Sequence, residues 1–175
     1  ENGLNNLNPT SERIKRYEIH LKDETPGIPV NALFIDSQQI LWIGTQQGLF
    51  KMSLDSARKD SLTHNLFVNL KNNASPGKAI LDKTVLAIQE DRVGDIWFGT
   101  SDGGLGKYNT EQNYIQEFIA DPNDDYSMPS NQVNAVYEDA SGVLWVGTNA
   151  GISILDKMKD RFSWHKRNQG NNNTI

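Results

Sequence analysis

The side chains that most often act as catalysts or metal ligands form no catalytic or metal-binding pattern in this sequence. The three histidines, His20, His64 and His165, occur singly and without the spacing of metal ligands on one helix. Cysteine is absent, so the chain has neither a disulfide framework nor thiol chemistry. We therefore expect no catalytic residue, no metal ion and no cofactor.

Two further clusters resemble binding loops but are better explained as turns. Asp121, Asp124 and Asp125 lie close together, yet they lack the glycine and glutamate of a calcium-binding loop. The glycine-rich segment 103–106 lies between two predicted strands, whereas a phosphate-binding loop connects a strand to a helix. Aspartate and glycine are both favoured in tight turns, so we interpret both clusters as turns.

Polar side chains that could bind a sugar recur just before the glycine of a predicted tight hairpin. Their amide, hydroxyl and carboxylate groups exchange hydrogen bonds with hydroxyl-rich ligands, and none of them is an evident general base. The candidates for ligand binding are Gln46, Gln47, Ser101, Asp102 and Asn149. The alternative is that these are ordinary turn residues and that the ligand is held elsewhere.

These hairpins belong to a unit that is repeated three times, over Val30–Leu54, Val85–Asn109 and Val133–Asp156. The central tryptophans lie 55 and then 48 residues apart. Self-similarity at this period, with strand-like content, is typical of a β-propeller. The identical columns are Val30/Val85/Val133, Ala32/Ala87/Ala135, Asp36/Asp91/Asp139, Trp42/Trp97/Trp145, Gly44/Gly99/Gly147, Thr45/Thr100/Thr148 and Gly48/Gly103/Gly151.

Each unit predicts one blade, a four-stranded antiparallel sheet. A β-branched and aromatic opening stretch predicts the innermost strand, and its small alanine fits the crowded propeller axis. The tryptophan strand follows, then the hairpin and a third strand. We expect looser fourth strands near Leu66–Leu70, Tyr114–Phe118 and Phe162–His165. The predicted fold class is all-β, with no long helix.

The repeated residues read as structural. We interpret the aspartates as caps of the turn between the first two strands rather than as catalytic acids. Gln39 stands where the second and third units have a turn glycine, so the first turn is expected to differ. Both faces of the tryptophan strand are apolar, and we assign the tryptophans to packing between blades rather than to sugar stacking. The glycine two residues later leaves room for the large ring or for a neighbouring backbone.

The amino-terminal segment fits the same frame as a half-blade. Gly3-Leu4 matches Gly48-Leu49, and Ile14–Ile19 then corresponds to a fourth strand. This divides the chain into 1–24, the trailing half of a blade, then 25–78, 79–127 and 128–175, one blade each with the start of a further connector at the end. An array of about three and a half blades cannot close a ring.

We therefore expect the chain to be a piece of a larger protein and to self-associate through its open ends. Two copies would amount to seven blades, although a second copy has no spare inner strands for the half-blade. The sequence starts at Glu1 and has no signal-like leader. No apolar run approaches the length of a membrane span.

Charge gives no reason to expect nucleic acid as a partner. The formal net charge is −5, from 22 acidic and 17 basic residues. The one local basic run, which contains Lys157, Lys159 and Arg161, is diluted by aspartates, and we interpret it as a solvated outer strand.

The repeats resemble the two-component regulator propeller repeat. That pattern is a strand ending in Glu-Asp or Gln-Asp, then a glycine, a Leu-Trp-Ile-Gly-Thr strand and Gly-Leu. Here it reads Glu90-Asp91, Gly94, Ile96–Thr100 and Gly103, and it recurs as Glu138-Asp139, Gly142, Leu144–Thr148 and Gly151. The connector Phe118–Asn131 also resembles the family's link between blades. Gln39, the extra glycine at 103–104 and the variant connector Asn72–Lys83 depart from the pattern.

The resemblance implies the periplasmic sensor region of a hybrid two-component regulator in a Bacteroidetes bacterium. Such proteins carry two seven-bladed propellers, an immunoglobulin-like domain, a membrane helix, a histidine kinase, a receiver and a DNA-binding region for transcription regulation. Many sense oligosaccharides. The resemblance thus implies a non-catalytic, periplasmic, carbohydrate-sensing segment whose parent spans the inner membrane. Two alternatives stay open: a propeller enzyme related to streptogramin-inactivating lyases, and a propeller that only binds proteins.

Overall fold

The chain forms a hairpin followed by three four-stranded antiparallel sheets, so the predicted all-β architecture of propeller blades is confirmed. The computed structural model describes residues 4–17, 19, 27–55, 67–72 and 78–166. The hairpin is β1 (Leu4–Leu7) and β2 (Ile14–Tyr17). The first blade is β3 (Val30–Ile35), β4 (Ile40–Thr45), β5 (Gly48–Ser53) and β6 (Val68–Asn69). The second is β7 (Val85–Glu90), β8 (Ile96–Thr100), β9 (Leu105–Asn109) and β10 (Tyr114–Phe118). The third is β11 (Val133–Glu138), β12 (Leu144–Thr148), β13 (Gly151–Asp156) and β14 (Arg161–Lys166).

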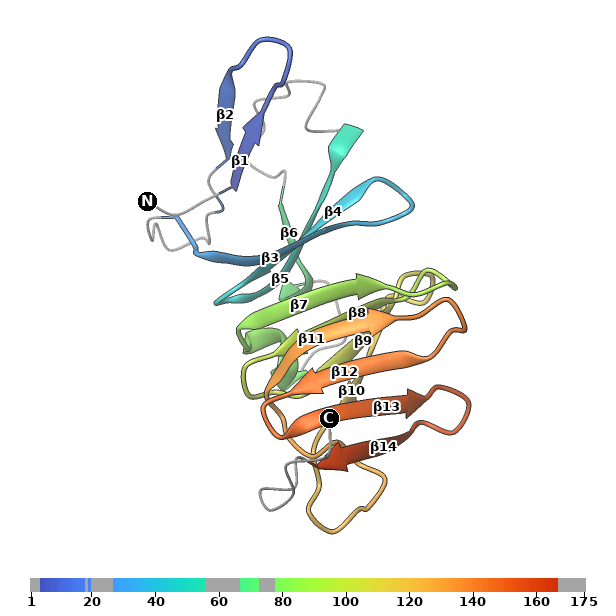
Figure 1. Cartoon of the computed structure of the whole chain (residues 1–175). Coiled ribbons are helices and arrows are strands. Elements are labelled where there is room, and N and C mark those ends of the chain that lie inside the picture. The colour runs from blue at the N-terminus through green and yellow to red at the C-terminus, as the bar shows by residue number, and fades with distance from the viewer. Residues whose placement is uncertain (1–3, 18, 20–26, 56–66, 73–77, 167–175) are drawn as a thin grey trace, which may run out of the picture.

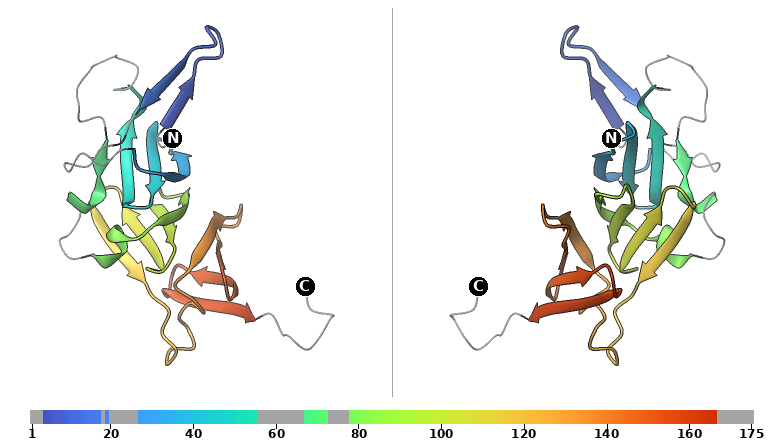
Figure 2. Two further views of the ribbon diagram at one scale, coloured as in Figure 1. Left: turned by 90° about the vertical axis from the view of Figure 1, so that its left-hand side faces the viewer. Right: turned by 90° about the vertical axis from the view of Figure 1, so that its right-hand side faces the viewer.

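The blades stand side by side, with the inner strands β3, β7 and β11 as neighbours and the outer strands fanned away from them (Figures 1 and 2). Two short 3₁₀ helices, η1 (Leu70–Asn72) and η2 (Ala79–Asp82), lie in the connection between the first two blades. The predicted fourth strands of the second and third blades are present as β10 and β14. The first is only the two-residue β6, and Leu66 lies outside the described residues.

Each tryptophan strand is covered on both faces where a neighbour exists. Trp42 packs into a core with second-blade residues that include Phe98, Tyr108 and Ile115. On the opposite face, Ile43 joins a core with Leu4 of the hairpin. The tryptophan side of a blade thus packs on the following blade, and the opposite side packs on the preceding one.

The glycines two residues after Trp42 and Trp97 make room for a valine of the next blade. A Cβ atom on Gly44 would lie 2.8 Å from a methyl carbon of Val85, and one on Gly99 would lie 2.5 Å from a methyl carbon of Val133. An irregularity in register follows the opening valine of all three inner strands. Such a bulge re-aims a side chain. The space that the sequence assigned to a ring or a backbone therefore holds mainly a neighbouring valine.

Two local expectations were wrong. The first turn does not differ, because Gln39 takes the left-handed conformation (φ 61°) that Gly94 (φ 87°) takes in the second blade, and both N–H groups bond the turn aspartate's carbonyl oxygen. The counterpart of Gly48 in the second blade is Gly104 rather than Gly103. Its carbonyl oxygen accepts the hydrogen bond from Thr100 at 2.9 Å, as that of Gly48 does from Thr45. The extra glycine lengthens the loop and leaves the β8–β9 register regular.

Candidate functional site

The turn aspartates cap their turns and also hold the tryptophans. In the second blade, one carboxylate oxygen of Asp91 accepts the backbone N–H groups of Val93 (3.1 Å) and Asp95 (3.0 Å). The other oxygen accepts Nε1–H of Trp97 at 2.9 Å. The same bond is 2.7 Å from Trp42 to Asp36 and 2.8 Å from Trp145 to Asp139. Sequence analysis did not predict this second role, although the constant six-residue spacing between aspartate and tryptophan pointed to it.

The glutamate before the aspartate binds the preceding blade. Glu138 accepts the backbone N–H of Arg92 at 2.9 Å and its side-chain Nε at 2.8 Å. Glu90 likewise accepts the backbone N–H and the hydroxyl of Ser37, at 2.8 and 2.6 Å. Residues 37 and 92 occupy the same turn position. We call the boundary between two adjacent blades a seam. At these two seams the glutamate therefore joins its blade to the preceding one.

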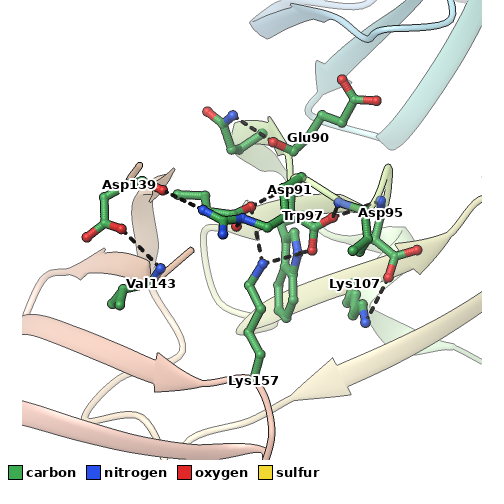
Figure 3. A network of polar contacts seen from close by, with 12 residues as sticks. Glu90, Asp91, Asp95, Trp97, Lys107, Asp139, Val143 and Lys157 are labelled. Atoms are coloured by element: carbon green, nitrogen blue, oxygen red, sulfur yellow. Dashed lines mark hydrogen bonds and ion pairs between the residues drawn. The ribbon is translucent and has the colours of Figure 1, made fainter. Parts of the chain in front are cut away.

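Lys157 is part of this seam, so its assignment to a solvated outer strand was wrong. Its ammonium group lies 3.0 Å from the Asp91 carboxylate and 3.2 Å from that of Glu138, as Figure 3 shows for Asp91. It also lies 5.8 Å from the ring centre of Trp97. The lysine thus joins the third blade to the turn of the second. By contrast, Lys159 forms an exposed ion pair with Asp156.

Hydrogen bonds lower the pKa of two of the turn aspartates, Asp91 and Asp139. Burial by itself would raise the pKa of Asp91, but hydrogen bonds from Trp97 and Lys157 outweigh it and hold the pKa below its usual value. Hydrogen bonds from Ser141 and Trp145 lower the pKa of Asp139 in the same way. A carboxylate engaged by this many donors stabilises a joint and is poorly suited to proton transfer.

The predicted ligand-binding residues lie at the opposite end of the blades from these aspartates. Each tryptophan strand begins beside its turn aspartate and ends at the hairpin that carries the candidates. Gln46, Gln47, Asp102 and Asn149 are exposed, and Ser101 is half-buried. We call this surface the hairpin end. Within the described residues, the contacts bring Ser101 and Asp102 together and join neither of them to the other three.

Connector residues add to the hairpin end. The ammonium group of Lys83 lies 2.6 Å from Asp102, whose carboxylate also accepts the Ser101 hydroxyl at 2.8 Å. These bonds, chiefly that from Lys83, lower the pKa of Asp102. The amide of Asn149 donates to Gln132 (3.3 Å), and the amide of Gln132 donates to Asn134 (3.3 Å). Sequence reasoning missed Lys83, Gln132 and Asn134, which lie within two residues of the valine that opens each repeat.

Metal-binding and membrane-spanning features are absent from the described part of the chain. No three acidic, histidine or cysteine side chains there are grouped so as to hold a metal ion. His20, His64 and the side chain of His165 lie outside it. Asp121 and Asp124 accept backbone N–H groups within their own turns, as interpreted from the sequence. No helix among the described residues has the length and apolarity to cross a bilayer.

The stacked four-stranded sheets and their repeated aspartate–tryptophan pairs define a β-propeller repeat protein. Residues 25–47, 79–102 and 127–150 match the family model described as two component regulator propeller. The chain thus carries three repeats of the two-component regulator propeller family.

Relatives with known names are much longer than this chain. It is 32% identical over 116 residues to histidine kinase P4 of Formosa agariphila, covering 66% of this chain and 8% of that protein. The extracellular domain of a hybrid two-component system of B. thetaiotaomicron has a similar structure, with a TM-score of 0.69 and 23% identity over 87% of this chain and 19% of that chain. Virginiamycin B lyase of Staphylococcus aureus superimposes with a TM-score of 0.63 and 18% identity, over 95% of this chain and 49% of that chain. These two structural likenesses show the fold alone.

Proposed function

We propose that this chain is a non-catalytic part of the periplasmic sensor region of a hybrid two-component regulator. The observation that carries the proposal is the threefold match to the regulator propeller repeat. The named relatives add support, since one is a histidine kinase and another is the extracellular domain of a hybrid two-component system. The parent protein would span the inner membrane and pass the signal to a kinase that controls transcription.

The ligand we infer is an oligosaccharide bound at the hairpin end of the intact sensor region. The exposed amides of Gln47 and Asn149 can donate to and accept from sugar hydroxyls, and the carboxylate of Asp102 can accept from them. Lys83 and Gln132 already orient two of these groups, which lowers the entropy cost of binding. Signalling then requires that the ligand bind two states of the sensor with different affinity.

A glycan panel tested against the full periplasmic region by thermal shift and calorimetry examines this proposal. We expect at least one oligosaccharide to bind, and Gln47→Ala and Asp102→Ala each to weaken it about tenfold by removing one hydrogen-bonding group. The matched controls lie at the opposite end of the blades: Gln38→Ala for the glutamine, and Asp156→Ala for an aspartate paired with an exposed lysine.

The outcomes separate the remaining classes of protein. Unchanged affinity in both hairpin-end variants would remove these residues from the site and leave the sensor role standing. Turnover of a panel member would instead favour the propeller enzyme, the class to which the lyase neighbour belongs. No binding by any glycan would favour a propeller that binds only proteins.

We also infer that further blades of the same protein cover the open ends of the array, and that the isolated chain self-associates through the exposed face of its third blade. Tyr137, Trp145 and Ile152 are exposed on the third blade, where the corresponding surfaces of the first two blades are covered. Sedimentation of the isolated chain over a range of concentrations tests this, since a single monomeric species at high concentration would contradict it.

A further inference from the structure

An apolar groove separates the β1–β2 hairpin from the first blade. It measures about 310 Å³, and Leu4, Tyr17, Leu41 and Met52 are among the residues that line it. Two of its other lining side chains, Leu7 and Ile35, are 60% and 51% exposed. Exposed apolar side chains gathered around one hollow are a common sign of a binding surface.

The strand registers show what the groove corresponds to. Leu4 pairs with Tyr17 as Leu105 pairs with Phe118 in the second blade. Leu41 pairs with Met52 as Leu144 pairs with Leu155 in the third. Leu105, Phe118, Leu144 and Leu155 all belong to the core that encloses Trp97. These four residues of the groove therefore occupy the same repeat positions as four residues that surround Trp97. The groove has the lining of a tryptophan site, but its lining includes no tryptophan.

We propose that the groove receives the tryptophan of a β-hairpin that carries the same Asp…Trp-x-Gly-Thr pattern, and that the second strand of this hairpin pairs with β1. Among the described strands, β1 pairs only with β2, and the addition of a strand to the edge of a sheet is a common mode of recognition. By analogy with the pairing of Trp42 with Lys51 and Gly44 with Leu49, the tryptophan falls opposite Asn6 and the glycine opposite Leu4.

The seam at this groove is apolar, whereas the seam between the second and third blades is ionic. Ile35 stands at the position of Glu138, and Leu54 stands at the position of Lys157, which pairs with Glu138 at 3.2 Å. Both Ile35 and Leu54 line the groove. The incoming turn is thus covered by hydrocarbon rather than by a carboxylate–lysine pair. Docking should depend weakly on salt, since screening acts on charges and not on apolar burial.

A strand pair fits the groove better than a complete blade does. The only exposed tryptophan in the described repeats, Trp145, belongs to a blade whose outer strands β13 and β14 would occupy the positions of β1 and β2. A second copy of this chain would therefore have to displace its partner's β1–β2 hairpin. The occupant we assign supplies two inner strands, and β1 and β2 complete its blade. This inference rests on the proposed function only in that the chain is part of an array of propeller blades. It does not depend on the proposed oligosaccharide ligand.

A fusion tests the proposal with the full chain. A copy of residues 85–100 is joined directly ahead of Glu1, because Glu1-Asn2-Gly3-Leu4 then takes the place that Gln46-Gln47-Gly48-Leu49 has after Thr45. We expect the unfolding temperature to rise by about 5 °C. The matched control is the same fusion with Trp97→Ala made only in the added copy, and it should lose most of that rise. Equal unfolding temperatures for the two fusions would overturn the proposal.

A second experiment adds the strand pair as a separate peptide. A fluorophore-labelled peptide of residues 85–100 should bind with one-to-one stoichiometry by anisotropy, with an affinity that changes less than about threefold between 50 and 500 mM salt. Leu7→Asp in the groove should weaken binding at least tenfold, whereas Ile152→Asp, at a similarly exposed position on the third blade, should not. Equal weakening by both substitutions, or a Leu7→Asp effect on the chain's own sedimentation without added peptide, would overturn the assignment of a strand pair and favour non-specific or self-association.

Discussion

Trp97 and Trp145 are the same residue of the same repeat in two different surroundings. Each donates its indole N–H to a turn aspartate, at 2.9 and 2.8 Å. Trp97 is 1% exposed because the third blade covers it, whereas Trp145 is 38% exposed. The turn, the strand and the hydrogen bond therefore form within one blade. Burial of the ring, which supplies most of its stabilising free energy, requires a neighbour.

The largest difference between the two positions should appear on truncation of the ring. Trp97→Ala should lower the free energy of unfolding by about 3–5 kcal/mol, because it empties a packed core. Trp145→Ala should cost under about 2 kcal/mol, since much of the ring already contacts solvent. Urea unfolding followed by circular dichroism measures both, at protein concentrations at which sedimentation shows a monomer. Equal losses there would show that Trp145 is covered within the monomer.

Substitution of the glycine two residues after each of these tryptophans extends the comparison. Gly99→Ala places a Cβ atom 2.5 Å from a Val133 methyl carbon and 2.9 Å from its carbonyl oxygen, and we expect a loss of about 3 kcal/mol. Gly147→Ala meets only Ala135 of its own blade, at 3.3 Å, and should cost under about 1 kcal/mol. The same unfolding measurement applies. A cost for Gly147→Ala as high as for Gly99→Ala would contradict an open third-blade face.

The ionic seam should matter more than an exposed pair nearby. Lys157→Met leaves the carboxylates of Asp91 and Glu138 without their shared cation, and we expect a loss of about 2 kcal/mol. Lys159→Met, which removes an exposed ion pair, should have no measurable effect.

The contribution of the Asp91–Lys157 contact to stability should also depend on pH. Because the pKa of Asp91 is lowered in the folded protein, its stabilising contribution is full above the ordinary value of about 4 and is lost as the pH falls through the lower folded value. Unfolding free energies between pH 7 and pH 2 should therefore fall less steeply for Lys157→Met than for the wild type. Parallel profiles would contradict a role for Lys157 in holding Asp91 ionised.

The smallest effects concern the turn that departs from the repeat. Gln39→Gly should stabilise the chain by about 0.5 kcal/mol, because glycine adopts the observed positive φ without strain but loses more chain entropy on folding. Gly94→Ala, at a site with no atom within 4 Å of the added Cβ, should destabilise it by about 1 kcal/mol through strain alone. Thermal unfolding resolves shifts of this size. A destabilising Gln39→Gly would mean that the glutamine side chain contributes to the turn.

Much of one blade could be predicted from the sequence, because a blade is built from local signals. Alternating apolar residues, aspartate and glycine in the turns, and the threefold repeat predicted the all-β fold, the order of strands and the turn caps. The predicted hairpin-end candidates Gln46, Gln47, Ser101, Asp102 and Asn149 are polar groups at one end of the blades, and their role in ligand binding stays a prediction.

Only the tertiary structure decided what passes between blades. Glu138 and Lys157 lie 19 residues apart in the sequence and meet Asp91 and Arg92 of another blade, a contact that no local pattern encodes. The same holds for Val133, which fills the space beside Gly99. It also holds for the groove at Ile35 and Leu54, because these apolar residues stand out only by comparison with the ionic pair at the same positions of the third blade. The sequence by itself determined the unit, since turns and strand pairing depend on neighbouring residues. The structure decided the joints, because packing and ion pairing depend on which faces the stacked units bring together.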